Sequence, residues 1–113
     1  MNEERAKENL PPLTENKSVT ALARIKSQEM YDKGYFAHES PTYGQAWDMY
    51  NAAGIRWNAV GENIAMGQTT PQQVVNSWMN SPGHRANILS ASYRQIGVGF
   101  CPQGNIWTQM FLG

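Results

Sequence analysis

The stretch Gln95-Ile96-Gly97-Val98-Gly99-Phe100 lies near the end of this chain. Its residues alternate with a period of two, which is typical of a β-strand that turns one face toward a core. The turn residues Pro102-Gln103-Gly104 follow, and residues 105–111 supply a second strand. The sequence therefore predicts an antiparallel β-hairpin close to the end of the chain.

A third strand is expected upstream of the hairpin, at residues 59–65. Because successive side chains of a strand point to opposite faces, Val60, Glu62 and Ile64 are expected to share one face. The lone Cys101 lies at the end of the first hairpin strand. We expect it to be buried, since a free cysteine packs as a small hydrophobic residue.

Helical patterns fill the rest of the chain, at residues 2–9, 18–32 and 44–53, from Thr70 onward, and as a single turn at 84–89. In the second segment Val19, Leu22, Ala23 and Met30 fall near one face, with Lys26 and Glu29 mostly elsewhere. In the third, Trp47 and Tyr50 are spaced as one apolar stripe. Helices followed by an antiparallel hairpin predict an α+β domain with helices packed on a small sheet.

The clearest helix start in the sequence is Thr70-Pro71-Gln72-Gln73. Thr70 is a good N-cap residue and proline is favoured at the first helical position. Gln73 is placed to close a capping box. The sequence therefore predicts a helix that begins at Pro71.

Composition limits the classes of protein that this chain can belong to. Its 113 residues form one domain, and its formal net charge is zero, so broad attraction to nucleic acid or anionic membranes is not expected. All the acidic residues lie at or before Glu62. One cysteine excludes an internal disulfide and a multi-thiolate zinc site.

No stretch is apolar enough to span a membrane. The first ten residues, MNEERAKENL, are too charged for the apolar core of a signal peptide. Two interpretations stay open at this point: a cytosolic protein, or a chain in which Met1 stands where an export signal has been removed.

The candidate functional residues are His38, Glu62 and His84, the two histidines of the chain and its last carboxylate. Imidazole titrates near neutral pH and is the commonest metal ligand in proteins. Both histidines lie among turn residues, and Glu62 lies between them in the sequence. If the fold brings the three together, they are natural candidates for one site.

Familiar catalytic arrangements are absent from the sequence. His38-Glu39 begins the pattern H-E-x-x-H, but Thr42 stands where the second histidine belongs. No G-x-S-x-G nucleophile elbow occurs. Ser40 and Ser81, which lie beside prolines, are interpreted as turn and capping residues.

A cleft with two histidines and one carboxylate therefore remains. His38 and His84 could hold a divalent ion such as zinc and leave positions for water or a ligand. Glu62 could ligate the ion, orient an imidazole or act as a general base. The alternative stays open that His84 only bonds a turn and that Glu62 only secures a bend.

Several ordered motifs resemble the CAP superfamily of cysteine-rich secretory proteins, antigen 5 and pathogenesis-related proteins, in its compact bacterial, SCP-like extracellular form. The motifs are Tyr35-Phe36-Ala37-His38-Glu39-Ser40-Pro41, Gly61-Glu62-Asn63-Ile64-Ala65, Trp78-Met79-Asn80-Ser81-Pro82-Gly83-His84-Arg85-Ala86-Asn87-Ile88-Leu89, Ile96-Gly97-Val98-Gly99 and Trp107-Thr108-Gln109. The resemblance implies a single CAP domain over residues 1–113. It also implies a three-layer α-β-α sandwich with a small, mainly antiparallel sheet.

The resemblance further implies that His38, Glu62 and His84 meet in a large central cleft. Many relatives carry a second acidic residue where this chain has Ser81. Its absence implies a poorer ligand set and weaker metal binding. Since relatives are mostly secreted or attached to the cell envelope, the resemblance favours an extracellular location and the removed-signal interpretation of Met1.

Three functions follow as hypotheses. The first is an extracellular binding module with little or no catalysis, whose cleft holds zinc or another divalent metal, a small ligand, a peptide or a cell-wall fragment. Tyr43, Trp57 and Tyr93 are its candidate rim residues. The alternative is a metal-assisted hydrolase of peptide or peptidoglycan with Glu62 as general base. The third is a structural adaptor. A monomer without an organic cofactor is expected in each case.

Overall fold

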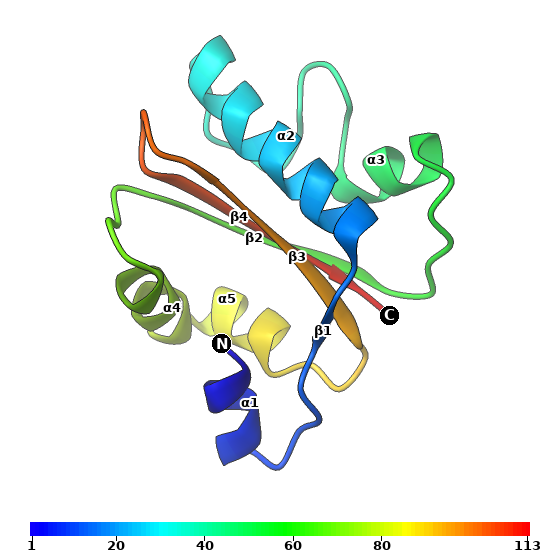
Figure 1. Cartoon of the computed structure of the whole chain (residues 1–113), viewed down its shortest axis with the longest axis vertical. Helices are drawn as coiled ribbons and strands as arrows, with labels where there is room; N and C mark the ends of the chain where they lie inside the picture. Colours follow the sequence, from blue (N-terminus) through cyan, green and yellow to red (C-terminus); the bar gives the residue numbers. More distant parts are fainter.

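The chain folds into three layers, with helices on both faces of a four-stranded sheet (Figure 1). This architecture comes from a computed structural model that describes all residues from 1 to 113. The strands are β1 (Thr14–Glu15), β2 (Val60–Met66), β3 (Gln95–Cys101) and β4 (Ile106–Leu112), in the order β1-β3-β4-β2. The predicted α+β class and the three-layer sandwich are confirmed.

The sheet is mainly antiparallel, as expected. β3 and β4 form the predicted hairpin, and β2 pairs antiparallel with β4 on the other side. β1 was not expected from the sequence, because its two residues are too short to show a periodic pattern. It pairs parallel with the start of β3. β2 is thus an edge strand, paired on one side only.

One helical layer consists of α2 (Lys17–Lys33) and α3 (Ala46–Ala52). α2 crosses β3 at very close range, which Gly97 and Gly99 make possible. A Cβ atom at Gly97 would lie 2.2 Å from the backbone nitrogen of Thr20, and one at Gly99 would lie 2.3 Å from the carbonyl oxygen of Ala23. The small residues of the hairpin motif therefore set the distance between helix and sheet.

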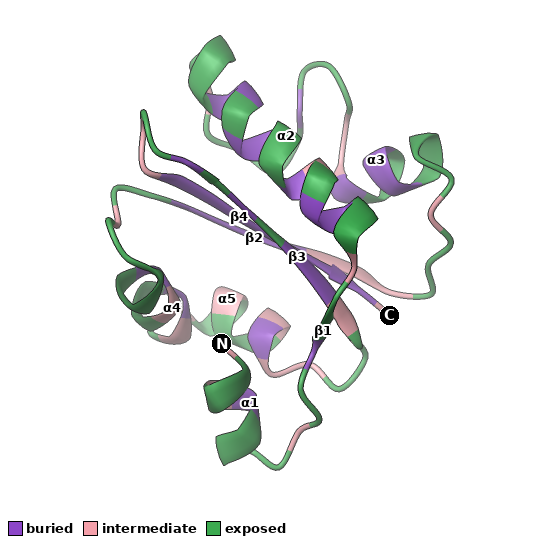
Figure 2. Cartoon of the chain, in the orientation of Figure 1, coloured by how far each residue is buried: buried purple, intermediate pink, exposed green.

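The other helical layer consists of α1 (Asn2–Lys7), α4 (Pro71–Met79) and α5 (Pro82–Ile88). Trp78 and Ile88 of this layer pack against Trp107 and Phe111 of β4. β4 lies between the two cores and is buried along its whole length (Figure 2). Its intervening residue Met110 faces the α2/α3 layer.

Three local expectations need correction. The helix predicted at 44–53 begins at Ala46, because Gly44 adopts a positive φ of 80° that a helix cannot contain. Thr70 caps α4 as predicted, but the Gln73 side chain accepts from Thr69 and not from Thr70. The single turn predicted from His84 is a seven-residue helix that starts at Pro82.

Candidate functional site

Glu62 projects from the edge strand β2 toward the α2/α3 layer. It is paired in register with Met110, so the two side chains share one face of the sheet. Its side chain is 5% exposed, which is uncommon for a carboxylate. A carboxylate in this position needs polar partners, and the neighbouring elements supply them.

His38 is the first partner of Glu62. Its Nδ1 lies 2.8 Å from Glu62 Oε1, while about half of the His38 side chain (53%) stays exposed. The loop that carries His38 is fixed by Ser40, whose backbone N–H donates to the carbonyl of Gly44 at 2.7 Å. The Ser40 hydroxyl also donates to Glu29 Oε1 at 2.5 Å. Ser40 is therefore a turn residue, as predicted, and its hydrogen bonds hold the loop of His38 in place.

Lys26 is the second partner, and the sequence interpretation missed it. The residue is fully buried, its Nζ donates to the backbone carbonyl of His38, and it lies 3.9 Å from Glu62 Oε1. Burial lowers the pKa of Lys26, and the charges of Glu62 and Glu29 act against that shift. The expectation that Lys26 and Glu29 lie off the buried face is wrong for both. Positions 19, 23, 26 and 30 share one helical face, so their spacing indicates that Lys26 is buried.

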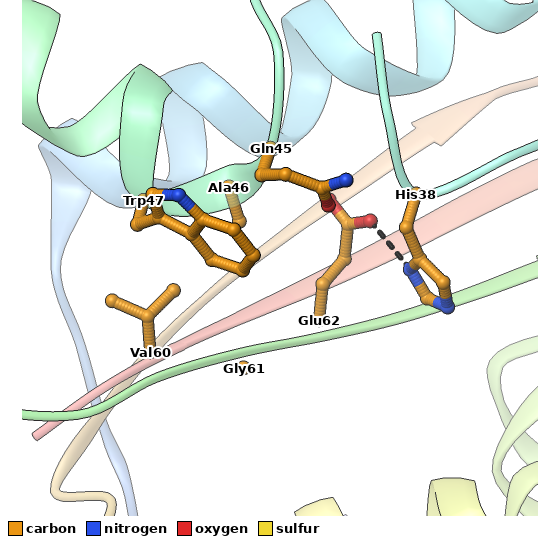
Figure 3. Close-up of a pocket in the computed structure, with 7 residues that line it drawn as sticks. All are labelled: His38, Gln45, Ala46, Trp47, Val60, Gly61 and Glu62. Carbon is orange, nitrogen blue, oxygen red and sulfur yellow. Dashed lines mark hydrogen bonds and ion pairs between the residues drawn. The ribbon is translucent and has the colours of Figure 1, made fainter.

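A cleft of about 390 Å³ opens beside the contact between His38 and Glu62 (Figure 3). Its walls come from the His38 loop, the start of α3 and β2. The lining residues are His38, Gln45, Ala46, Trp47, Val60, Gly61 and Glu62. One oxygen of Glu62, Oε2, is buried and makes no hydrogen bond. The cleft thus combines a polar end at Glu62 and an aromatic side wall.

That aromatic wall is Trp47, for which the sequence predicts a place in an apolar helix stripe with Tyr50. Tyr50 is buried as expected, but Trp47 is 46% exposed and faces the cleft. None of the three predicted rim residues lines this cleft. Tyr93 instead stacks on Phe111 and donates to the carbonyl of Val60 at 3.1 Å.

His84 lies in the opposite layer of the sandwich, on α5. Its Nδ1 lies 2.9 Å from the Ser81 hydroxyl, so the residue at the position of the missing acid contacts this imidazole. His84 is not among the residues that line the cleft. Burial and the nearby charge of His38 both lower the pKa of His84. The charge of His38 thus opposes protonation of His84, although the two residues belong to opposite helical layers.

A network of side-chain amides attaches α5 to β2 and so fixes His84 relative to Glu62. Asn87 Nδ2 donates to Asn63 Oδ1 at 2.8 Å and to the Glu62 carbonyl at 3.2 Å. Asn63 Nδ2 donates to the His84 carbonyl at 3.1 Å and to Gln109 Oε1 at 3.2 Å. These amides belong to the motifs that carry the family resemblance, but residue types alone did not assign them a role.

The donor set for a metal ion is small. No three side chains among His, Cys, Asp and Glu are grouped so that they could hold one ion. Nε2 of His38 and Nε2 of His84 make no hydrogen bond, whereas each Nδ1 has a partner. The free ring nitrogens are the atoms that could ligate.

Fold and site together define a class: small α-β-α domains with a histidine and a buried glutamate at the edge of a mainly antiparallel sheet. Residues 1–111 match the cysteine-rich secretory protein family, the CAP family. The chain belongs to this family, which confirms the resemblance drawn from its motifs.

The chain is similar to a protein of Bacillus subtilis (strain 168) that is described as the uncharacterized protein YkwD. The two are 53% identical over 112 residues, which is 99% of this chain and 44% of YkwD. A second relative from the same strain, the uncharacterized membrane protein YlbC, is 32% identical over 96% of this chain and 31% of its own length. This chain thus spans less than half of the length of these relatives.

Solved structures show the same fold. A crystal structure of an extracellular protein containing a SCP domain from Bacillus anthracis str. Ames superimposes with a TM-score of 0.93, at 33% identity, over 98% of this chain and 37% of that one. An outer surface protein from Borrelia burgdorferi gives a TM-score of 0.88 at 21% identity, over 98% of this chain and 84% of that one, and shows the fold alone. No helix of the present structure has the length and apolar character needed to cross a membrane.

Proposed function

We propose that this domain is an extracellular or cell-envelope binding module in which His38 and His84 hold a divalent metal ion, zinc in the first instance. The proposal rests on the hydrogen bonding of the two imidazole rings. In each, Nδ1 is engaged by a neighbouring side chain and Nε2 is left without a partner. Metal-binding histidines typically have this arrangement, because a hydrogen bond at one nitrogen fixes the tautomer and directs the other nitrogen to the metal.

Glu62 is proposed to orient His38. It accepts a hydrogen bond from Nδ1–H, and this leaves Nε2 unprotonated and able to ligate. Lys26 lies beside Glu62 and donates to the carbonyl of His38, so the carboxylate and the loop share one buried anchor. With one oxygen committed to His38 and its side chain buried, Glu62 suits orientation better than proton abstraction from a substrate.

Ser81 is proposed to do the same for His84, with a neutral hydroxyl in place of a carboxylate. A hydroxyl makes the ring less basic than a carboxylate partner would, so His84 is expected to be the weaker ligand. Two protein ligands leave coordination positions open to water or to a bound molecule. Affinity for the free ion is accordingly expected to be modest.

The cleft beside His38 is proposed to receive the rest of a bound molecule, because Trp47, Ala46 and Val60 offer apolar surface there. A peptide or cell-wall fragment is proposed to place a ring or an apolar side chain against Trp47. The buried Oε2 of Glu62, which has no partner, can accept an N–H or O–H from such a ligand after a small rearrangement. An extracellular location is supported by the relative with a SCP domain, which is described as an extracellular protein.

Isothermal titration calorimetry with zinc chloride tests the proposal. The wild-type chain is expected to bind one ion, with affinity that falls as pH drops through the imidazole range, since a protonated ring cannot ligate. His38→Ala and His84→Ala are each expected to weaken binding by about tenfold or more, because removing a ligand costs at least as much affinity as removing the partner that orients it.

The matched control is Cys101→Ser, which removes the one thiol of the chain and leaves both histidines. This variant should bind zinc as the wild type does. If the His38→Ala, His84→Ala double variant binds zinc with wild-type affinity, the ion lies elsewhere and the proposed metal site is wrong.

A further inference from the structure

A second hollow lies at the end of the sheet where β3 begins and β4 ends, and it shares no lining residue with the His38 cleft. Its volume is about 540 Å³. Two arginines, one tryptophan and three uncharged polar side chains line it: Arg56, Arg94, Trp57, Thr14, Asn58 and Gln95. No acidic side chain is among its lining residues.

Neither guanidinium of this hollow has an ionic partner. Arg56 and Arg94 form no salt bridge and donate no side-chain hydrogen bond, unlike Arg5 and Arg85. Glu15 follows the lining residue Thr14 in the sequence but does not line the hollow itself. Its carboxylate accepts a hydrogen bond from the Thr20 hydroxyl on α2 at 2.8 Å. Two unpaired guanidiniums in one concave surface attract an oxyanion, which can accept paired N–H bonds from each.

Backbone hydrogen bonds fix Arg94 itself and the segment that follows Arg56. The carbonyl of Arg94 accepts from Thr14 at 3.1 Å, and its N–H donates to Leu112 at 2.9 Å. Asn58, two residues after Arg56, donates its N–H to the carbonyl of Gly113. One side of the hollow is therefore built on strand ends, and the other on the segment between α3 and β2, which Asn58 attaches to the last residue of the chain.

Trp57 gives the hollow an aromatic face. Its ring is 39% exposed, and its Nε1–H donates to Asn51 Oδ1 at 2.9 Å, which holds the ring in one orientation. A fixed, half-exposed indole offers a flat apolar surface to the C–H face of a sugar ring. Asn58, Gln95 and Thr14 supply amide and hydroxyl groups of the kind that bond sugar hydroxyls.

We infer that this hollow is a binding site for an anionic saccharide, with the phosphate or carboxylate on Arg56 and Arg94 and the sugar ring on Trp57. Two classes of ligand combine a hydroxylated ring with an oxyanion, sugar phosphates and uronic acids. The site is independent of the metal site proposed at His38 and His84. Failure of one leaves the other standing.

Nuclear magnetic resonance titration tests the site through the indole N–H of Trp57. The probes are glucose 6-phosphate and glucuronate, with glucose and inorganic phosphate as the neutral and the non-sugar comparisons. At least one anionic sugar is expected to shift the Trp57 resonance saturably, with a Kd lower by about tenfold than that of glucose or of phosphate. The anionic sugar that binds identifies the class of ligand.

Variants test whether the two arginines cause the preference for anionic sugars. The Arg56→Gln, Arg94→Gln double variant is expected to lose the anionic preference while its other resonances stay in place. Arg24→Gln, at an exposed arginine of α2 outside the hollow, is the matched control and should bind as the wild type does. Binding of inorganic phosphate as tight as that of the sugar phosphate, an adventitious ion only, would overturn the inference, as would no shift with either anionic sugar.

Discussion

Lys26 and Glu62 form a buried ion pair beneath the proposed metal site, with 3.9 Å between Nζ and Oε1. Both charges are removed from water, so each depends on the other and on the hydrogen bonds around it. His38 contributes both a ring nitrogen and a backbone carbonyl to this group. The proposed metal site and the stability of the fold are thus linked through these three residues.

The first prediction concerns this coupling. Glu62→Gln keeps an oxygen for His38 but leaves the Lys26 ammonium without its counter-charge, so the free energy of unfolding should fall by about 1–3 kcal/mol. Lys26→Met should cost a similar amount. The double variant should lose less than the sum, because neither partner is then left alone. Strictly additive losses in urea denaturation would show that the two side chains do not depend on each other.

A second prediction at this scale concerns His84. Its pKa is lower in the fold than the usual value of 6.5. As the pH drops from this value toward the folded-state pKa, the unfolded chain binds more protons than the folded one, so the free energy of unfolding falls. Above this window both states are neutral and His84 contributes no slope.

His84→Gln should flatten this part of the stability profile, measured by denaturation between about pH 7.5 and 5. His38→Gln should flatten it in part, since the charge of His38 is the smaller of the two causes that lower the pKa of His84. A profile of His84→Gln that keeps the wild-type slope would assign the slope to other groups.

At the scale of elements, the contact between α2 and β3 is set by glycines that leave no room for a side chain. Gly97→Ala would bring a methyl group to 2.2 Å from the Thr20 nitrogen, so α2 must move away from the sheet. We expect a loss of about 1–3 kcal/mol in the free energy of unfolding, as for other overpacked cores. Gly99→Ala should behave alike.

Gly83→Ala is the matched control for these variants. Gly83 lies in α5, and an added Cβ would meet nothing within 4 Å. Alanine is favoured over glycine in a helix, so this variant should be neutral or slightly more stable. A Gly97→Ala variant as stable as Gly83→Ala would mean that the helix does not approach the strand as closely as described.

The strands and long helices could be predicted because their patterns are periodic and their ends carry turn residues. The two residues of β1 could not, since their strand state depends on pairing with β3 and on nothing local. The start of the third helix could not be placed, because Gly44 and Gln45 look compatible with a helix until the positive φ of Gly44 is known. Pairing with β3 decided the first case, and the local bridge between Ser40 and Gly44 decided the second.

At the scale of the whole molecule, the candidate residues come from both helical layers and from the edge strand β2 between them. The contact between His38 and Glu62 follows from motifs that the sequence shows. Lys26 and Trp47 could not be assigned from residue types, because a lysine at a buried helical position and a tryptophan at an exposed one both oppose the usual distribution.

The proposed metal site has few protein ligands because of how the acidic residues are distributed along the chain. The acidic residues all precede Asn63, so α4 and α5 have no carboxylate to offer, and Ser81 stands beside His84. One ion between His38 and His84 would connect the α2/α3 side of the sandwich with the α4/α5 side. Binding would then stabilise the arrangement of the layers as well as the rings.

The most direct test is a crystal of the chain grown with zinc and measured with anomalous diffraction at the zinc edge. We predict one anomalous peak within about 2.0–2.1 Å of both Nε2 atoms, those of His38 and His84. A peak that contacts the Nδ1 atoms, that lies at other residues, or that touches one histidine alone would contradict it.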